Sequence, residues 1–388
     1  MDITPSKTKL TDTQKLNWLR LIRSENVGPV TFRQLINKFG GAAEALEALP
    51  HMSKRGGSTK PIRIYSIAEA EKELKTAQKI GADLVALGEM GYPPWLATID
   101  APMPLLYTKG NKDLVEKPII AIVGSRNGSA IGQKFTRMIA SELGREGHVI
   151  VSGLARGIDT AAHQAALEAG TLAVLAGGLD IIYPPENADL HYHIGQKGLL
   201  ISEMPPGFKP RGQDFPRRNR IISGMAIAVL VIEAASRSGS LVTARFAAEQ
   251  GREVFAVPGN PLDPRAAGTN KLIKDGANLL TCAKDVMDTI APMLGQLPDP
   301  SKGQMKSSNA EMDLSTMNYE DITLSDRERV IQALSPCPTD IDEIIRYSGV
   351  DARLVHIVLL ELDLAGRLER HGRQLVSIQP TQLTHSLL

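Results

Sequence analysis

The sequence of 388 residues is poor in cysteine and has no apolar run long enough to cross a membrane. Its two cysteines, Cys282 and Cys337, are too few for a disulfide framework or a zinc knuckle, and they are typical of a reducing cytosol. The N-terminal stretch MDITPSKTKLTD lacks the apolar core of a signal peptide. We therefore expect a cytoplasmic protein that does not enter the membrane.

A strong excess of charge of one sign is also absent, because 44 Lys and Arg balance 43 Asp and Glu. This balance excludes a histone-like polycation but permits a local basic patch. Residues 301–388 hold 9 basic and 13 acidic residues, so the remainder of the chain is net positive. If a polyanion binds, we expect its main site within the first 300 residues.

The distribution of apolar residues divides the chain into four segments. Residues 1–85 predict a small helical domain with a connector, in which Val27-Gly28-Pro29 separates two helices and residues 51–63 form a basic loop. This helical hairpin is typical of modules that contact nucleic-acid backbones, but it also fits any pair of packed helices. Residues 293–320, rich in Pro, Ser, Gly and Met, predict a linker. Residues 321–388 predict three helices and a hairpin with its tip at His371-Gly372, which is the plan of a winged helix.

Residues 86–292 alternate short β-branched runs with Ala-rich helical segments. Runs such as 119–123 and 229–232 are apolar throughout, which indicates strands that are buried on both faces. Helical segments such as 132–145 and 243–250 separate the runs and predict parallel crossovers. The fold class is therefore α/β, with an extended Rossmann-like, doubly wound and mostly parallel sheet.

The predicted carboxyl ends of the strands, where such sheets bind ligands, are rich in Gly and Ser. Turns that open a helix present N–H groups and a positive dipole to a phosphate, although Gly is also ordinary in tight turns. Arg126 interrupts the dinucleotide-binding fingerprint after the first of these strands. The candidate phosphate-binding residues at these ends are Gly124, Ser125, Arg126, Ser152, Gly153, Arg156, Gly178, Ser238, Gly239, Ser240 and Thr243.

Residues 211–220 hold four arginines against a single acid, Asp214. Arginine grips phosphate through a planar fork, and an aromatic ring beside it can stack on an unpaired base. We therefore add five residues to the predicted DNA interface: Phe215, Arg217, Arg218, Asn219 and Arg220. The alternative is structural, with the arginines paired to Glu203, Glu233 and Glu249 and the ring in the core.

Recognisable catalytic patterns are missing from the sequence. No histidine pair has metal-ligand spacing, and neither a Walker A loop nor a Gly-x-Ser-x-Gly nucleophile turn occurs. Asp159, Asp180 and Glu203 lie near the predicted strand ends and could transfer protons, but such carboxylates more often orient loops or pair with arginine. We predict no catalytic residue, no metal and no cofactor, and a protein that is not an enzyme.

Several motifs occur in an order that resembles the DNA-processing protein A family (DprA, also called Smf). The resemblance covers roughly residues 90–285 and includes Gly124-Ser125-Arg126, Ser152-Gly153-Leu154-Ala155-Arg156-Gly157-Ile158-Asp159 with His163, Gly178-Leu179-Asp180 with Tyr183-Pro184, Phe215-Pro216 with Arg218-Asn219-Arg220, Ser238-Gly239-Ser240 and Gly268-Thr269-Asn270. It implies that the chain binds and protects single-stranded DNA and loads the RecA recombinase onto it during natural transformation. It also implies a homodimer whose interface lies near residues 268–280, including Leu272, Ile273 and Leu279.

Two alternatives belong to other functional classes. A Rossmann enzyme resembling the nucleotide-cleaving phosphoribohydrolases would also bind phosphate at Gly-rich strand ends, but its Pro-Gly-Gly-x-Gly-Thr loop is missing here. A winged-helix regulator would read duplex DNA through the predicted helix 352–365. That helix carries one arginine against Glu361 and Asp363, whereas major-groove readers usually carry more positive charge. We therefore expect the winged helix to contact protein or to have an accessory role.

Overall fold

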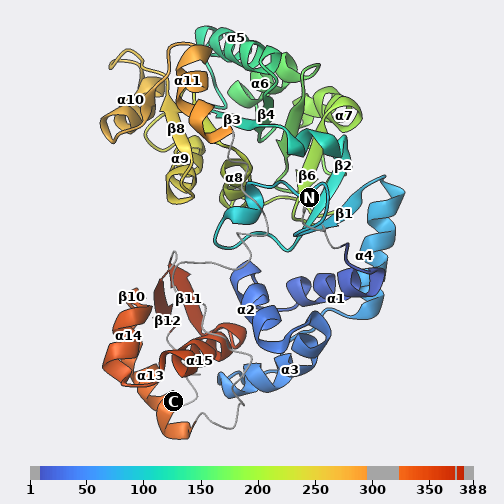
Figure 1. The fold of residues 1–388 in the computed structure, drawn as a ribbon, viewed down its shortest axis with the longest axis vertical. Helices are drawn as coiled ribbons and strands as arrows, with labels where there is room; N and C mark the ends of the chain where they lie inside the picture. Colours follow the sequence, from blue (N-terminus) through green and yellow to red (C-terminus); the bar gives the residue numbers. More distant parts are fainter. Residues whose placement is uncertain (1–8, 295–322, 372–373, 380–388) are drawn as a thin grey trace, which may run out of the picture. The chain divides into compact units, whose positions relative to one another are not determined.

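The structure is a computed structural model that describes residues 9–294, 323–371 and 374–379. These residues form two compact units, which Figure 1 shows as ribbons. The larger unit contains residues 72–294, and the smaller combines residues 10–71 with the described residues from 323 onward. The predicted linker at 293–320 lies outside the described residues, except for its first two positions, which end a helix.

Within the described part of the larger unit, nine strands form one sheet in the order β1-β2-β6-β5-β4-β3-β7-β8-β9. All neighbours from β6 to β9 pair in parallel, while β2 pairs antiparallel with both β6 and β1. This arrangement confirms the predicted mostly parallel, doubly wound sheet. The strands are β1 (Asp83–Ala86), β2 (Leu105–Gly110), β3 (Ile119–Val123), β4 (Val149–Ser152), β5 (Thr171–Val174), β6 (Leu199–Ser202), β7 (Ala228–Val231), β8 (Glu253–Ala256) and β9 (Asn278–Leu279).

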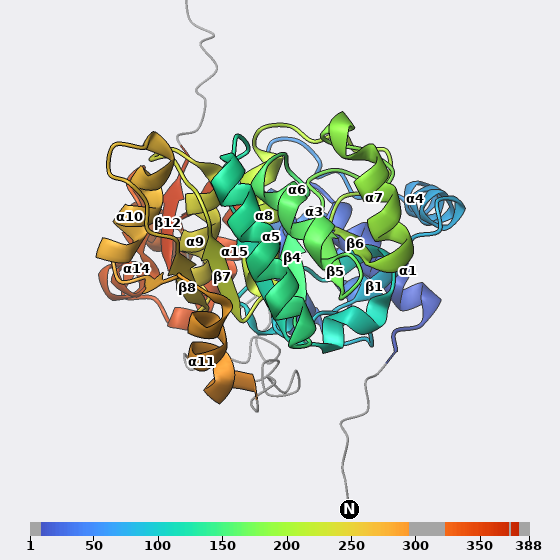
Figure 2. The ribbon, with the colours of Figure 1, turned by 90° about the horizontal axis from the view of Figure 1, so that it is seen from above.

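Helices cover both faces of this sheet, because the central strands are apolar on both sides. Alternate residues of β3 show the division: Ile120 and Ile122 pack toward one set of helices, and Ile119 and Val123 toward the other. The first set is α5 (Ala130–Arg145), α6 (Ile158–Ala166) and α11 (Ala283–Leu294), of which α5 and α6 lie side by side in Figure 2. The second set is α8 (Asp214–Met225) and α9 (Gly239–Glu249).

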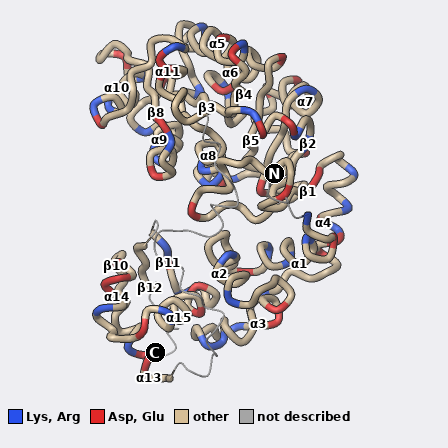
Figure 3. Tube along the Cα trace, in the orientation of Figure 1, with Lys and Arg blue, Asp and Glu red and all other residues tan. Residues whose placement is uncertain are grey.

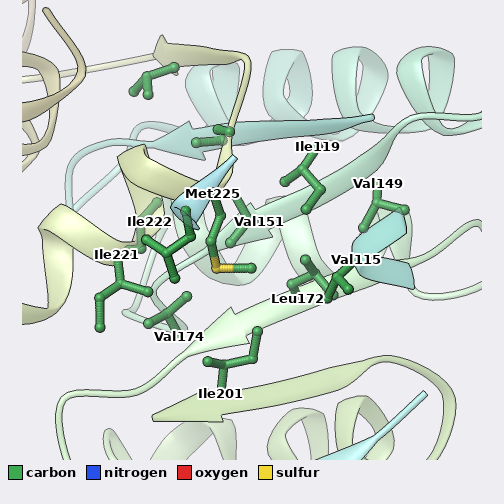
Figure 4. Packing of buried hydrophobic residues seen from close by; sticks show 14 of the residues in the cluster. Val115, Ile119, Val149, Val151, Leu172, Val174, Ile201, Ile221, Ile222 and Met225 are labelled. Carbon is green, nitrogen blue, oxygen red and sulfur yellow. The ribbon is translucent and has the colours of Figure 1, made fainter. Parts of the chain in front are cut away.

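Apolar packing joins α8 to the central strands of the sheet. In Figure 4, Ile221, Ile222 and Met225 of α8 lie over Val151 and Val174, and all five side chains are buried. Burial of each such side chain contributes about 1.5–3 kcal/mol. The sheet therefore fixes the position of α8. The remaining elements of this unit are α7 (Ala188–Lys197), α10 (Ala267–Lys274) and the short 3-10 helices Leu96–Thr98, Lys112–Glu116, Pro185–Asn187 and Pro264–Ala266.

The order of the strands reverses between β3 and β7. From β3 the chain adds β4, β5 and β6 on one side, and it then returns to place β7, β8 and β9 on the other. The carboxyl ends of parallel strands share one edge, so the loops after β3, β4, β5, β6 and β7 meet there. Open α/β sheets bind ligands at this place.

The smaller unit contains the N-terminal helices and the winged helix. Its elements are α1 (Asp12–Arg23), α2 (Pro29–Phe39), α3 (Ala42–Arg55), α13 (Leu324–Ala333), β10 (Thr339–Asp340), α14 (Ile341–Ser348), α15 (Ala352–Leu364), β11 (Leu368–His371) and β12 (Leu375–Ile378). Three helices followed by the antiparallel β11–β12 pair confirm the predicted winged helix. Gly40 ends α2 with φ of 75°, a conformation that favours glycine.

One expectation for the N-terminal region was wrong, and one helix was not foreseen. The predicted loop at 51–63 begins as helix, since α3 continues to Arg55 despite Pro50. The helix α4 (Ile67–Lys79) was not predicted, because its sequence IAEAEKELKTAQK is mostly polar. No helix in the described ranges is long and apolar enough to span a bilayer.

Candidate nucleic-acid interface

An arginine–aromatic cluster lies at the carboxyl edge of the sheet, where three loops meet. Phe215 lies in the first turn of α8, Arg126 lies in the loop after β3, and Tyr183 lies in the loop after β5. The Phe215 ring centroid lies 5.4 Å from that of Tyr183 and 5.2 Å from the guanidinium carbon of Arg126. Arg126 and Tyr183 are exposed, and no carboxylate among the described residues lies within ion-pairing distance of Arg126. The cluster therefore offers a cation and two aromatic rings to a ligand.

Arg218 lies beneath this cluster and is only 6% exposed. Its Nη1 donates to the carbonyl of Gly153, at 2.6 Å, and to the carbonyl of Val174. Burial lowers the pKa of Arg218 to about 10, while the nearby Asp159 raises it, so the guanidinium stays protonated at neutral pH. Arg218 was predicted to bind phosphate, but its guanidinium is bound to backbone carbonyls at the ends of two strands.

A buried polar network holds the loop after β4. Asp159 Oδ2 accepts the N–H groups of Gly153 and Ala155 at 3.1 and 3.3 Å. Burial raises the pKa of the Asp159 carboxyl, and the charge of Arg218 opposes this shift. Asp159 therefore orients a loop, which is one of its two sequence-based interpretations.

His163 supports the same loop from below. Its Nε2 accepts the N–H of Leu154 at 3.3 Å, and its Nδ1 lies 2.7 Å from Thr171 Oγ1. Burial, with the charge of Arg218, lowers the pKa of His163 to about 3. The imidazole is consequently neutral at physiological pH and serves as an acceptor.

Gly157 brings the loop after β4 against the loop after β3. Its φ is 77°, and a Cβ atom there would lie 2.5 Å from the carbonyl oxygen of Ser125 and 2.7 Å from that of Arg126. Both the conformation and the space thus require glycine. This contact fixes the backbone that carries Arg126.

The other two arginines of the 211–220 segment share one carboxylate. Glu203 Oε1 lies 2.8 Å from Arg217 Nε, and its Oε2 lies 2.9 Å from Arg220 Nη2. The side chain of Arg220 is 18% exposed, whereas that of Arg217 is 47% exposed. The alternative in which these arginines pair with Glu203 therefore holds for Arg217 and Arg220. Arg217 nevertheless retains access to solvent.

Most of the Gly and Ser residues at the strand ends shape turns. Ser152 is buried and donates to the carbonyl of Ile122 at 2.6 Å, and Gly178 is buried with its N–H bound to the carbonyl of Phe208. Ser238 Oγ lies 2.7 Å from Ser240 Oγ. The buried members of the predicted set are Ser152, Gly153, Gly178, Arg218, Ser240 and Thr243, and the exposed members are Arg126, Arg156, Arg217 and Gly239. The half-buried members are Gly124, Ser125, Phe215, Asn219, Arg220 and Ser238.

The start of α5, where a dinucleotide-binding Rossmann protein holds its pyrophosphate, already faces a carboxylate. Ser129 caps α5 and donates its N–H to Glu233 Oε2 at 2.8 Å and its hydroxyl to Oε1. A Cβ atom at Gly132 would lie 2.6 Å from this carboxylate. Because a second anion there would be repelled, the geometry disfavours a nucleotide phosphate at this position.

Tyr183 was not predicted as a site residue, although it lies in one of the motifs that resemble the family. The signal that could have identified Tyr183 is an aromatic residue in the loop that follows β5. This residue is 46% exposed. Figure 3 shows basic and acidic residues spread through both units, so the cluster is distinguished by local geometry and not by net charge. In the described ranges, no group of three His, Cys, Asp or Glu residues could hold a metal ion.

Fold and site together define a Rossmann-like protein in which an arginine–aromatic cluster replaces the dinucleotide fingerprint, joined to a helical domain and a winged helix. Residues 83–291 match the family model of DNA recombination-mediator protein A, residues 12–76 match the DprA-like N-terminal HHH domain, and residues 320–372 match the DprA winged helix domain. The chain belongs to the DNA recombination-mediator protein A (DprA/Smf) family, which confirms the resemblance seen in its motifs.

Relatives from several bacteria are similar over much of their length. The chain is 44% identical over 223 residues to the DNA processing protein DprA of Bacillus subtilis, covering 57% of this chain and 75% of the relative. It is 32% identical to the protein Smf of Synechocystis, covering 92% and 97%. The X-ray structure of DprA from Streptococcus pneumoniae matches with a TM-score of 0.61 and 36% identity, over 72% of this chain and 98% of that one. A DprA structure from Helicobacter pylori, described as showing a unique single-stranded DNA binding mode, matches with a TM-score of 0.50 and 29% identity, over 55% and 96%.

Proposed function

We propose that this chain binds single-stranded DNA along the carboxyl edge of its sheet. The observation that carries the proposal is the cluster of the exposed Arg126 and Tyr183 with the half-buried Phe215, next to the buried Arg218. Arg126 contacts a phosphate, and the two rings stack on an unpaired base. The single-stranded DNA binding described for the Helicobacter pylori relative supports this assignment.

The buried members of the predicted set act indirectly in this proposal. Arg218 holds the ends of β4 and β5 together, and Gly153 provides the carbonyl that it grips. Arg156 and Arg217 are exposed, although each lies near a carboxylate, Glu186 and Glu203 respectively, and in this proposal they extend the binding surface beyond the cluster. The backbone path along which the DNA strand lies is set by the turns that contain Gly124, Ser125, Asn219 and Gly239.

The direct test measures fluorescence anisotropy of a labelled oligothymidine with the full chain. Loss of one stacked base costs about 1–3 kcal/mol, so Phe215→Ala should weaken binding by roughly 5- to 150-fold. Arg126→Ala should weaken binding and reduce the slope of log K against log salt by about 0.7. Arg145→Ala is the matched control, since Arg145 is exposed at the opposite end of α5. Wild-type affinity in both site variants would refute the proposal.

We further propose that the bound strand is passed to the RecA recombinase during natural transformation, without chemistry by this chain. The family membership supports a role in recombination. The assay is RecA ATP hydrolysis on DNA precoated with single-strand-binding protein, which the full chain should stimulate and Arg126→Ala should not. An HPLC search for base released from nucleoside monophosphates tests the enzymatic alternative, and release of free base would contradict the absence of catalysis.

A homodimer through α10 and β9 completes the proposed function. Leu279 lies on the edge strand β9 and is 50% exposed, and Ile273 is half-buried on α10, whereas Leu272 packs against the core of the same unit. Leu279→Asp should convert a dimer to a monomer in light scattering after size exclusion. A wild-type monomer at micromolar concentration would exclude this interface.

A further inference from the structure

The third helix of the winged helix, α15, has no exposed residue: each of its 13 residues is buried or half-buried. One side of α15 packs in the winged helix's own core, which includes Val355, Val358 and Leu362. The other side places Leu360 and Leu364 in the core of the N-terminal helices. Since a helix that reads the major groove must present a side to DNA, α15 cannot do so in this arrangement.

Hydrogen bonds close this contact at the carboxyl end of α15. The Leu364 carbonyl, which has no partner within its helix, accepts Asn26 Nδ2 at 3.1 Å and Ser53 Oγ at 3.3 Å. Arg367 Nη1 donates to the carbonyl of Gly56 at 3.0 Å. A Cβ atom at Gly56 would lie 2.0 Å from the Glu361 carbonyl oxygen, so the two backbones touch. The contact is therefore both apolar and hydrogen-bonded.

A carboxylate of the winged helix lies at the start of α2. Gly28 precedes α2 and supplies no side-chain cap. Thr31, in the first turn, donates its hydroxyl to Asp363 Oδ2 at 2.8 Å, and Arg370 lies 3.1 Å from the same oxygen. A helix N-terminus attracts anions, and a DNA phosphate approaching α2 would meet Asp363.

The charges of the two partners are complementary. Residues 10–63 carry 9 basic and 4 acidic residues, whereas residues 323–371 carry 6 basic and 9 acidic residues. The helical hairpin is thus the more basic partner, and the domain that covers it is acidic. Attraction to a polyanion would act on the same basic domain.

We propose that the winged helix is the intramolecular partner of the N-terminal helical hairpin and that it withholds this hairpin from DNA. We name the contact the clasp and define it as residues 360–367 against Asn26, Thr31, Ser53 and Gly56. With the clasp closed, α15 and the start of α2 cover each other, and neither contacts a duplex. This inference does not depend on the proposed single-stranded site.

Cross-linking tests the clasp in the full chain. Thr31 is only 3% exposed and its hydroxyl lies 2.8 Å from Asp363 Oδ2, so in a background with Cys282→Ser and Cys337→Ser a Thr31→Cys/Asp363→Cys pair should form a disulfide under a mild oxidant and give an internally linked monomer at every concentration. The control pair is Thr31→Cys/Tyr347→Cys, because Tyr347 lies on α14 and is 82% exposed. Equal reaction of both pairs, or linkage only between two chains, would overturn the proposal.

A second test opens the clasp. Leu360→Asn places an amide in the N-terminal core while leaving the winged helix's own core intact. Amide exchange over 25–33 and 360–366 should rise at least tenfold, and affinity for a short duplex at low salt should rise at least tenfold, with DNA protecting residues 25–33. Tyr347→Asn is the matched control and should change neither.

A milder variant guards against unfolding of the winged helix by Leu360→Asn. Asn26→Ala/Ser53→Ala removes both side-chain donors to Leu364 and should give the same changes at smaller size. If amide exchange shows that the clasp has opened but duplex affinity does not rise, the winged helix does not withhold the hairpin from DNA. A wild-type chain that already binds duplex as tightly as the open variants would refute it as well.

Discussion

Arg218 and Arg126 both approach the Phe215 ring, at 5.9 and 5.2 Å, but the structure gives them different roles. We predict that Arg218→Met destabilises the fold, whereas Arg126→Met weakens DNA binding alone. Methionine retains much of the apolar stem of arginine but cannot donate a hydrogen bond. The substitution therefore isolates the guanidinium.

The magnitude follows from the two carbonyls that Arg218 binds, those of Gly153 and Val174. Each buried carbonyl left without a donor costs about 1–3 kcal/mol. Methionine avoids the cost of burying a charge, which offsets part of this loss. We expect the free energy of unfolding to fall by about 3 kcal/mol for Arg218→Met and by less than about 0.5 kcal/mol for the exposed Arg126→Met.

Urea unfolding measures the first quantity, and the salt dependence of oligothymidine binding measures the second. Arg126→Met should lower the slope of log K against log salt by about 0.7, while folded Arg218→Met should keep the wild-type slope. If Arg218→Met proved as stable as the wild type and lost the same slope, its guanidinium would reach a phosphate. The assignment of Arg218 as a positioning residue would then be wrong.

Three further predictions concern the support of the site. The pKa of His163 is lowered to about 3, so below pH 6.5 the unfolded chain binds more protons than the folded chain. Each pH unit of acidification there should lower the free energy of unfolding by up to about 1.4 kcal/mol. His163→Gln should flatten this pH dependence in urea unfolding between pH 7 and 5, and an unchanged dependence would contradict the prediction. Glu203→Gln should lower stability by about 1–3 kcal/mol because Arg220 loses its counter-charge, and should raise DNA affinity because Arg217 is released; weaker binding would count against this. Gly157→Ala should lower the midpoint of thermal unfolding by at least several degrees and weaken DNA binding. The φ of Gly157 is 77°, and two carbonyl oxygens occupy the space that a Cβ atom would need. A midpoint equal to that of the wild type would show that alanine is not strained at this position.

The sheet and the position of its carboxyl edge could be predicted because they depend on local patterns. Runs such as 119–123 are apolar at every position, which is typical of a strand covered on both faces, and helical segments between them require parallel connections. The winged helix was predictable for the same reason, from three apolar-periodic helices and a hairpin. Glycine and serine at the strand ends marked the edge correctly, although most of them only shape its turns.

The directions of the arginines could not be predicted, because they depend on the rotation of α8 about its axis. Successive helical residues differ by about 100°, so Arg217 points outward while Arg218 enters the protein. The segment Phe215-Pro216-Arg217-Arg218-Asn219-Arg220 has no apolar periodicity that would reveal this rotation. The contact of α15 with the N-terminal helices was equally hidden, since its partners lie more than three hundred residues apart, as in Asn26 and Leu364.

The guanidinium of Arg126 lies over the Phe215 ring. A nucleobase that binds here either stacks on the outer side of the guanidinium or displaces it and stacks on the Phe215 ring. In both cases the base makes its contact through its flat face. Every base has such a flat side, so the exchange favours none of the four. At the proposed site, a DNA strand of any composition would therefore be held with similar strength.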